Sequence, residues 1–177
     1  RNPSLPGADG PANLQAALLI AASPRARNIG VMAAFNDEIH AARFVRKTHT
    51  ANPATFRSAP LGPIGWMAEG KPVLAMTPVR PFSLPAPASP PPPVALFTST
   101  MGDDGLLFDA VTAAGYKGLV VEAFGGGHVR AATVPKLEAL ANVMPVVLAS
   151  RTGGGEMLRA TYGFPGGGPD DQYRSER

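Results

Sequence analysis

The sequence has no cysteine, so disulfide bonds and thiolate metal sites are excluded from the outset. Charged residues make up only 16% and aromatic residues 7%, and no apolar run approaches the roughly 20 residues that span a membrane. Hydrophobic residues nevertheless reach 45%, which indicates a packed globular protein and not a disordered chain. The 177 residues can hold one ordinary domain or two small ones.

Positive and negative charges nearly balance: the net charge is +3, and the basic residues are scattered along the sequence. Their densest cluster is Arg43, Arg46 and Lys47, and no ladder of aromatic side chains accompanies it. Nucleic-acid binding needs a continuous basic face with stacking partners, so it is a weak hypothesis here. We expect neither nucleic acid nor a membrane among the partners.

Histidine, the commonest side-chain ligand of metals, is scarce. The three histidines, His40, His49 and His128, are too dispersed in the sequence to suggest a metal site. A Ser–His–Asp triad can be assembled on paper from Ser58 or Ser150, but no G-x-S-x-G turn supports it. We expect no metal and no cofactor.

The first part of the chain shows signals for a helix, a strand and a hairpin. Asp9 is a candidate helix N-cap, and apolar residues follow at helical spacing until Ser23 and Pro24. The continuous apolar run 29–35 is typical of a strand buried on both faces of a parallel sheet. Residues 66–76 are expected to form a hairpin that turns at Glu69 and Gly70.

Residues 77–93 differ sharply in composition and end in four consecutive prolines. Such a run cannot join a helix or a sheet interior, and it favours extended polyproline II structure. We expect a linker between domains, because an apolar run begins again immediately afterwards; a ligand for an SH3-type domain is the alternative.

Strand and helix signals alternate after this linker. Strands are expected at 94–98, 117–123 and 145–150, and helices at 103–114 and 131–142. That order predicts parallel strands joined by right-handed crossovers.

Residues 36–50 carry candidate chemistry and read N-D-E-I-H-A-A-R-F-V-R-K-T-H-T. As a strand, residues 44–50 place Val45, Lys47 and His49 on one face. A lysine on a packed face is desolvated, and desolvation favours the neutral amine that can act as a base. The alternative is a lysine at a strand end with its ammonium in water.

This stretch resembles the segment N-D-E-I-H-A-A-R-D-V-T-K-T-H-T of bacterial L-asparaginases. Further segments are similar to motifs of that family, and the resemblance covers nearly all of residues 1–166. These segments are 8–14 (A-D-G-P-A-N-L), 55–58 (T-F-R-S), 61–65 (L-G-P-I-G), 115–122, 145–153 and 161–166.

The resemblance implies an α/β fold. It comprises the end of a larger N-terminal α/β domain at 1–76, the Pro-rich linker at 77–93, and a smaller doubly wound, Rossmann-like C-terminal domain at 94–177. It also implies an amidohydrolase that converts L-asparagine and water to L-aspartate and ammonia through a threonine nucleophile and an acyl-enzyme. The implied assembly is a homotetramer, a dimer of dimers with active sites between subunits, and we expect a cytoplasmic location.

Three candidate site residues follow from the family's motifs. Lys47 corresponds to the lysine of the second catalytic triad, a Thr–Lys–Asp group that activates the attacking species. His128 ends a glycine turn that approaches the active site of a neighbouring subunit in the family; the alternative is a histidine satisfied in a surface turn. Glu156 is a candidate for binding substrate across the same interface; the alternative is a solvated loop carboxylate.

The glycine turn at 125–127 has a second interpretation as a dinucleotide fingerprint. That interpretation fails on spacing, because Arg130 stands where the third glycine belongs. Glu122, at the end of the preceding strand, is expected to anchor this turn.

The sequence departs from the family in ways that bear on activity. The T-G-G-T motif that holds the nucleophile and the T-D-T motif are not among these 177 residues, and we expect both to precede Arg1. The fragment alone is therefore expected to be inactive. Phe44 stands where the family has Asp, and Arg46, which stands where it has Thr, adds a positive charge beside Lys47.

Three hypotheses about function stay open. The first is an asparaginase known in part, whose preference between asparagine and glutamine the sequence does not give. The second is the asparaginase-like subunit of a tRNA amidotransferase. The third is a non-catalytic family member or a lone α/β binding module that uses the turn ending at His128.

Overall fold

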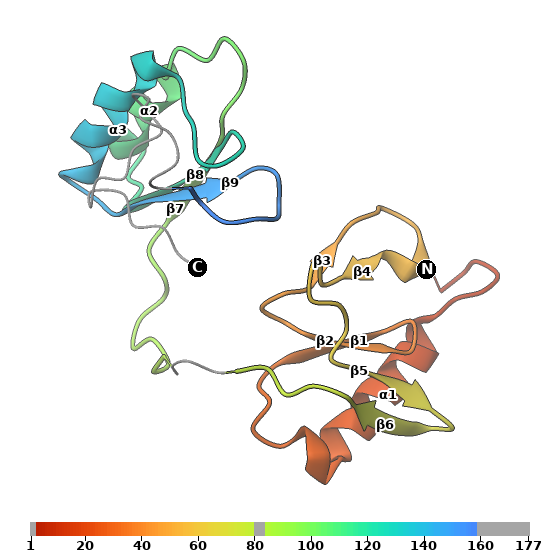
Figure 1. Cartoon of the computed structure of the whole chain (residues 1–177). Coiled ribbons are helices and arrows are strands. Elements are labelled where there is room, and N and C mark those ends of the chain that lie inside the picture. Colours follow the sequence, from red (N-terminus) through yellow and green to blue (C-terminus); the bar gives the residue numbers. More distant parts are fainter. Residues whose placement is uncertain (1–2, 80–83, 159–177) are drawn as a thin grey trace. The chain divides into compact units, whose positions relative to one another are not determined.

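A computed structural model describes residues 3–79 and 84–158 (Figure 1). The chain forms two compact units, Arg1–Pro85 and Ala86–Arg177, and the division falls within the proline-rich segment. No helix in the described ranges is long and apolar enough to cross a membrane.

The first unit is built on a four-stranded antiparallel sheet with the strand order β1-β2-β5-β6. Its strands are β1 (Met32–Phe35), β2 (Glu38–Ala41), β5 (Gly65–Ala68) and β6 (Lys71–Leu74). Asn36 and Asp37 join β1 to β2, and all of Asn36, Asp37, Glu69 and Gly70 have positive φ angles. That backbone suits the tight turns that match strand twist. The predicted hairpin with its turn at Glu69 and Gly70 is confirmed.

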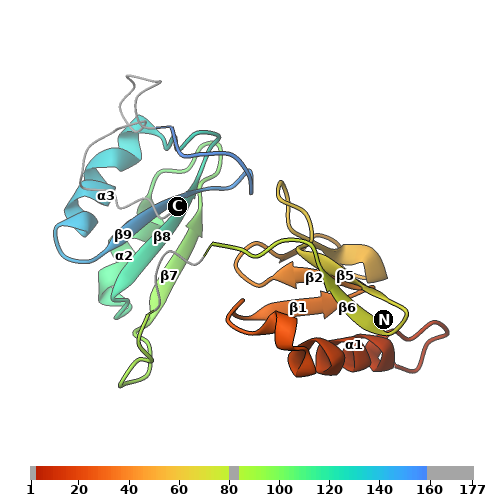
Figure 2. The same cartoon turned by 60° about the horizontal axis from the view of Figure 1, so that its bottom comes forward.

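Helix α1 (Gly10–Ala22) covers one face of this sheet, as Figure 2 shows. Asp9 occupies the N-cap position and Ser23 ends the helix before the 3₁₀ turn Pro24–Ala26, so the expected helix is confirmed. Between helix and sheet lies an apolar core of five buried residues, Ile20, Ile29, Ile39, Ala41 and Ile64.

The run 29–35 does not form the buried parallel strand that its composition predicts. Only Met32–Phe35 is a strand; it pairs antiparallel with β2 and each of its residues is half-buried. The reason is the connection, because a two-residue turn can only join antiparallel neighbours. Strand β1 therefore forms an edge of the sheet.

A separate two-stranded sheet pairs β3 (Arg46–Lys47) with β4 (Phe56–Arg57). The 3₁₀ turn Pro53–Thr55 lies between them and leads directly into β4. The strand expected over 44–50 is thus only two residues long. It ends because the His49 ring folds back on the chain: its Nδ1 accepts hydrogen bonds from the amides of Ala51 (3.1 Å) and Asn52 (3.0 Å).

The second unit contains a parallel sheet with the strand order β7-β8-β9. Its strands are β7 (Val94–Thr98), β8 (Gly118–Ala123) and β9 (Val146–Ser150), close to the predicted positions. Helices α2 (Leu106–Ala113) and α3 (Val134–Ala141) are shorter than predicted. Residues before α2 form local turns, in which Asp103 and Asp104 accept hydrogen bonds from the amides of Gly105 and Leu106. The 3₁₀ turn Ala131–Thr133 precedes α3.

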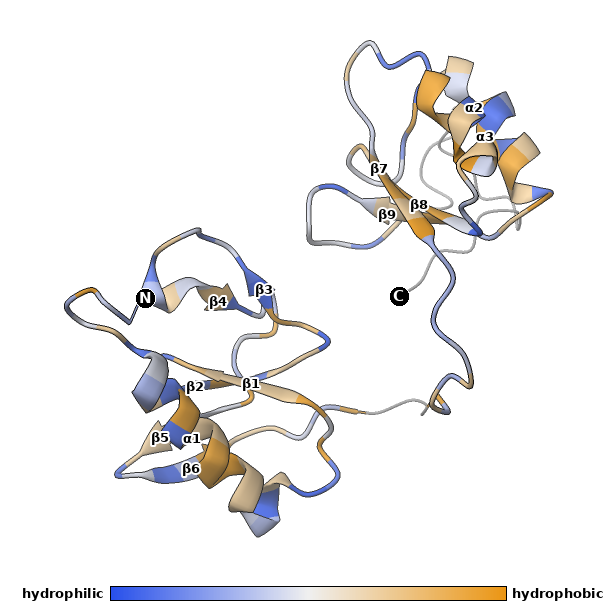
Figure 3. Cartoon of the chain, turned by 180° about the vertical axis from the view of Figure 1, so that it is seen from behind, coloured by the Kyte–Doolittle hydropathy of each residue, from blue (hydrophilic) through white to orange (hydrophobic). Residues whose placement is uncertain are grey.

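Both helices pack on the same face of this sheet, so the described residues hold one of the two helix layers of a doubly wound fold. The core between them is apolar and consists of Phe108, Val111, Leu119, Val121, Leu137, Leu140, Met144 and Val146. Strands β7 and β8 are strongly apolar along their length (Figure 3). The α/β class is confirmed, and the parallel sheet of this unit is consistent with the expected Rossmann-like domain.

Candidate active site

Lys47 ends strand β3 and pairs with Phe56 of β4. Its side chain is exposed, as is that of His49, while Val45 is half-buried. The expected packed face shared by these three residues is therefore wrong in this chain: β3 stops at Lys47 and leaves its ammonium in water. Any desolvation of Lys47 has to come from another segment that covers β3.

An open hollow of about 440 Å³ lies beside Lys47. It combines an aromatic wall, a cation and polar groups that donate and accept hydrogen bonds, which suits a small polar ligand. The lining residues are Leu5, Phe35, Lys47, Thr50, Ala51, Asn52, Pro53 and Thr55.

Positive charge concentrates around this hairpin. Arg46 lies directly opposite Arg57 in the β3–β4 register, and like charges in that position destabilise a strand pair. The two departures from the family motif have different consequences. Phe44 packs against the apolar core of the first unit and lies 4.8 Å below the guanidinium of Arg43, whereas Arg46 only adds to the charge.

Glu38, His40 and Ser58 form a largely buried polar cluster beside the β3–β4 hairpin, and the sequence does not predict it. His40 Nδ1 is 2.9 Å from Ser58 Oγ, and His40 Nε2 is 3.3 Å from Glu38 Oε2. Ser58 is only 3% exposed, so it is out of reach of a substrate as a nucleophile. Strand alternation places Glu38 and His40 on one face, but nothing in the sequence reveals that Ser58, 18 residues later, meets them.

The glycine turn of the second unit follows β8 at the carboxyl edge of the parallel sheet. Phe124 N–H donates to His128 O (2.8 Å), and the amides of Gly127 and His128 donate to Phe124 O (2.9 Å each). These bonds hold the half-buried His128 at the end of the turn. The segment after β9 passes close to this turn. Leu158 N–H donates to Gly126 O (2.8 Å), and a Cβ added to Gly127 would lie 2.5 Å from Met157 Cε.

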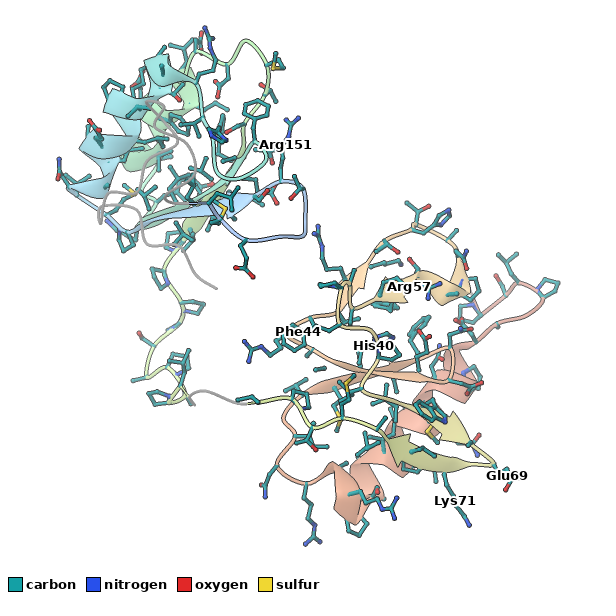
Figure 4. The ribbon with its side chains drawn as sticks, viewed as in Figure 1. His40, Phe44, Arg57, Glu69, Lys71 and Arg151 are labelled. Atoms are coloured by element: carbon teal, nitrogen blue, oxygen red, sulfur yellow. The ribbon has the colours of Figure 1, made fainter. Side chains whose placement is uncertain are left out.

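The anchor of this turn is Ser150 and not Glu122. Ser150 Oγ donates to Gly125 O (2.5 Å), whereas the Glu122 carboxylate accepts from Thr98 Oγ (2.7 Å) and so links β8 to β7. The prediction for Glu122 is wrong because its side chain bonds to its cross-strand partner on β7 and not to the glycine turn. Arg151 completes this edge: its guanidinium donates to Ser99 O (2.7 Å) and lies 4.3 Å from the Phe124 ring (Figure 4).

Glu156 is exposed and lies in the segment that follows β9. Lys47 belongs to the first unit, and His128 and Glu156 belong to the second, so the structure describes two separate candidate regions. In the described ranges, no group of three or more histidine, aspartate or glutamate side chains is arranged to hold a metal ion.

Comparison with known proteins identifies both units. Residues 1–80 match the family model "Asparaginase, N-terminal" and residues 93–174 match "Glutaminase/Asparaginase C-terminal domain". The chain is 33% identical over 154 residues to L-asparaginase 2 of Bacillus subtilis, covering 84% of this chain and 41% of that protein. It is 30% identical over 171 residues to a glutamyl-tRNA(Gln) amidotransferase subunit of Methanosarcina acetivorans, covering 92% and 40%.

Among solved structures, the probable cytoplasmic L-asparaginase of Campylobacter jejuni matches with a TM-score of 0.79 and 32% sequence identity, over 85% of this chain and 49% of that one. The chain spans about half the length, or less, of these relatives. The two family models together cover most of both units, in the order in which the sequence motifs occur. The chain belongs to the bacterial L-asparaginase family.

Proposed function

We propose that the protein containing these residues hydrolyses the side-chain amide of L-asparagine to L-aspartate and ammonia. The observation that carries the proposal is the place of Lys47, in the family's motif and beside the open hollow at β3. The threonine nucleophile lies outside the 177 residues. We keep residues 1–76 as part of the N-terminal domain, 77–93 as the linker and 94–177 as the C-terminal domain.

The reaction requires a proton to move as the nucleophile attacks. The threonine oxygen forms a bond to the amide carbon, its proton passes to a base, and the carbon–nitrogen bond breaks as ammonia leaves with a proton. Water then cleaves the ester and releases aspartate. In this proposal the Lys47 amine carries the proton of the attacking group, and a segment outside the chain covers the lysine.

The second region is proposed to complete the active site of a neighbouring subunit in a homo-oligomer. His128 has a backbone held by hydrogen bonds to Phe124, which suits a positioned binding group. Glu156 is exposed and free to reach a ligand on another subunit. The identity to the amidotransferase subunit supports a second candidate, release of ammonia for use on a tRNA-linked substrate by a partner subunit.

Replacement of Lys47 tests the proposal in the protein extended at its N-terminal side. Lys47→Met preserves length and removes the amine, so we expect turnover of L-asparagine to fall by about 10²-fold or more, as for loss of an acid–base group. Arg46→Met is the matched control on the same strand and should retain turnover within a few-fold. Comparable turnover of both variants and the parent would show that Lys47 is structural.

The 177-residue chain itself is the second control. Because the proposed nucleophile lies outside it, the purified chain should release no ammonia from L-asparagine above background. Measurable ammonia release by the chain alone would contradict the proposal that the nucleophile lies outside it. The role of Lys47 would still be tested by Lys47→Met. Ammonia release that needs a partner subunit and a charged tRNA would favour the amidotransferase candidate.

A further inference from the structure

His40 is buried, 1% exposed, on the face of the first sheet opposite α1. The Glu38 carboxylate lies 3.3 Å from His40 Nε2 on this face. On the other side of the ring, His40 Nδ1 and the Ser58 hydroxyl share a hydrogen bond of 2.9 Å. The cluster thus forms a directional bond between β2 and the residue that follows β4.

The β3–β4 pair needs such a bond, because it is weak by itself. Each strand has two residues, and an isolated two-stranded sheet is marginal in water. The opposed Arg46 and Arg57 weaken it further. The position of Lys47 therefore depends on what fixes the pair to the rest of the unit.

Two contacts fix it to the four-stranded sheet. In the β1–β2 register, Phe35 and Glu38 are partners and Ala33 and His40 are partners, so these side chains share one face. The Phe35 ring meets Phe56 of β4 with centroids 4.5 Å apart, a contact that allows sliding. The His40–Ser58 bond is directional, and Figure 4 shows His40 on the side of the sheet where β4 and Arg57 lie.

We propose that His40 is a positioning residue: through Ser58 it holds the β3–β4 pair in place and so sets where Lys47 stands. Only the catalytic consequence of this role rests on the function proposed above. The anchoring itself is a property of the 177-residue chain and is measurable without activity.

Amide hydrogen exchange in the intact 177-residue chain tests the anchoring. The Thr48 amide, bonded to Thr55 O at 2.9 Å, reports on the hairpin, and the Ile64 amide, bonded to Ile39 O at 2.8 Å, reports on the sheet. We expect His40→Leu and the milder Ser58→Ala to speed exchange at Thr48 about tenfold, with little change at Ile64. His40→Asn retains a side chain that can share a hydrogen bond with Ser58 and should restore most of the protection.

Ile39→Val is the matched control, because Ile39 is buried on the other face of the same strand. It should speed exchange at both amides in parallel. Parallel increases in His40→Leu and Ser58→Ala, or an unchanged Thr48 amide in both, would overturn the positioning role.

In the extended enzyme, His40→Leu should lower kcat by about 10²-fold with a small change in KM, because a displacement of about 1 Å has a cost of that order. Selective loosening of Thr48 with unchanged kcat would overturn the link to catalysis. If Lys47→Met were also without effect on turnover, the catalytic role of Lys47 would fall while the anchoring stood; absence of L-asparagine hydrolysis in the extended parent would remove the proposed function itself.

Discussion

Gly127 has a backbone conformation that favours glycine. Its φ is +118°, and an added Cβ would lie 2.5 Å from Met157 Cε. We expect Gly127→Ala to destabilise the second unit by about 2 kcal/mol, mainly from backbone strain, because the end of the flexible Met157 side chain can move away. Native-state exchange of the Arg151 amide, which donates to Ala123 O at 3.0 Å, measures that loss.

Gly125 supplies the matched comparison two residues earlier. Its φ is +45° and nothing lies within 4 Å of an added Cβ, so Gly125→Ala should cost only about 1 kcal/mol. Equal losses for the two variants would contradict the larger backbone strain expected at the φ of Gly127.

At the scale of elements, the opposed arginines of β3 and β4 make a stability prediction. Arg46→Thr, which restores the residue usual in the family, should stabilise the pair by about 0.5 kcal/mol, because it removes a like-charge cross-strand contact. Exchange of the Thr48 amide measures the effect at low ionic strength. Arg57→Thr should give a similar gain in stability. The double variant should gain little more than either single variant, because each single substitution already removes the repulsion between the two arginines.

The dependence of Thr48 exchange on salt concentration distinguishes charge repulsion from a difference in the strand propensities of arginine and threonine. Raising the ionic strength should slow Thr48 exchange in the parent toward that of Arg46→Thr, because screening weakens the repulsion of exposed charges. A difference between the two proteins that salt leaves unchanged would contradict the electrostatic origin.

The elements that the sequence predicts correctly are those whose signals are local. Helix α1 begins and ends at its capping positions, the Glu69–Gly70 turn fixes its hairpin, and apolar runs mark the strands of the parallel sheet. The strand at 44–50 fails because the His49 ring captures two amides ahead of it. The candidate lysine is predictable from its motif, but its exposure and its anchor at His40 are set by contacts between segments distant in sequence.

At the scale of the whole chain, each unit leaves apolar surface uncovered. In the second unit, Val94 and Leu96 are 54% and 67% exposed on the face of β7 that no described helix covers. In the first, Leu14 and Leu18 of α1 are each 63% exposed and Val31 is 79% exposed. Parallel sheets are normally covered on both faces, so the exposed face of β7 is a surface suited to further packing.

The two edges of the first sheet differ in their protection. Edge strand β6 carries Lys71 and Pro72, which block pairing with another chain, whereas edge strand β1 contains only apolar residues. The first unit also has the smaller buried core. We expect an unprotected apolar edge beside exposed leucines to favour association between copies of the chain.

We therefore expect the 177-residue chain to self-associate through its first unit, with the second unit the better-folded part. Sedimentation over a range of concentrations should show oligomers that Leu18→Lys and Val31→Lys together convert to monomers, because buried charge opposes the contact. Leu96→Lys, an equally large change in the second unit, should leave association intact. In the monomeric double variant, amides of residues 29–35 should exchange faster than those of Val94–Thr98 and Val146–Ser150, since an edge strand opens without disrupting the rest of the fold. Equal protection of all three strands in that monomer, or dissociation caused by Leu96→Lys, would assign the association and the weaker fold to a different part of the chain.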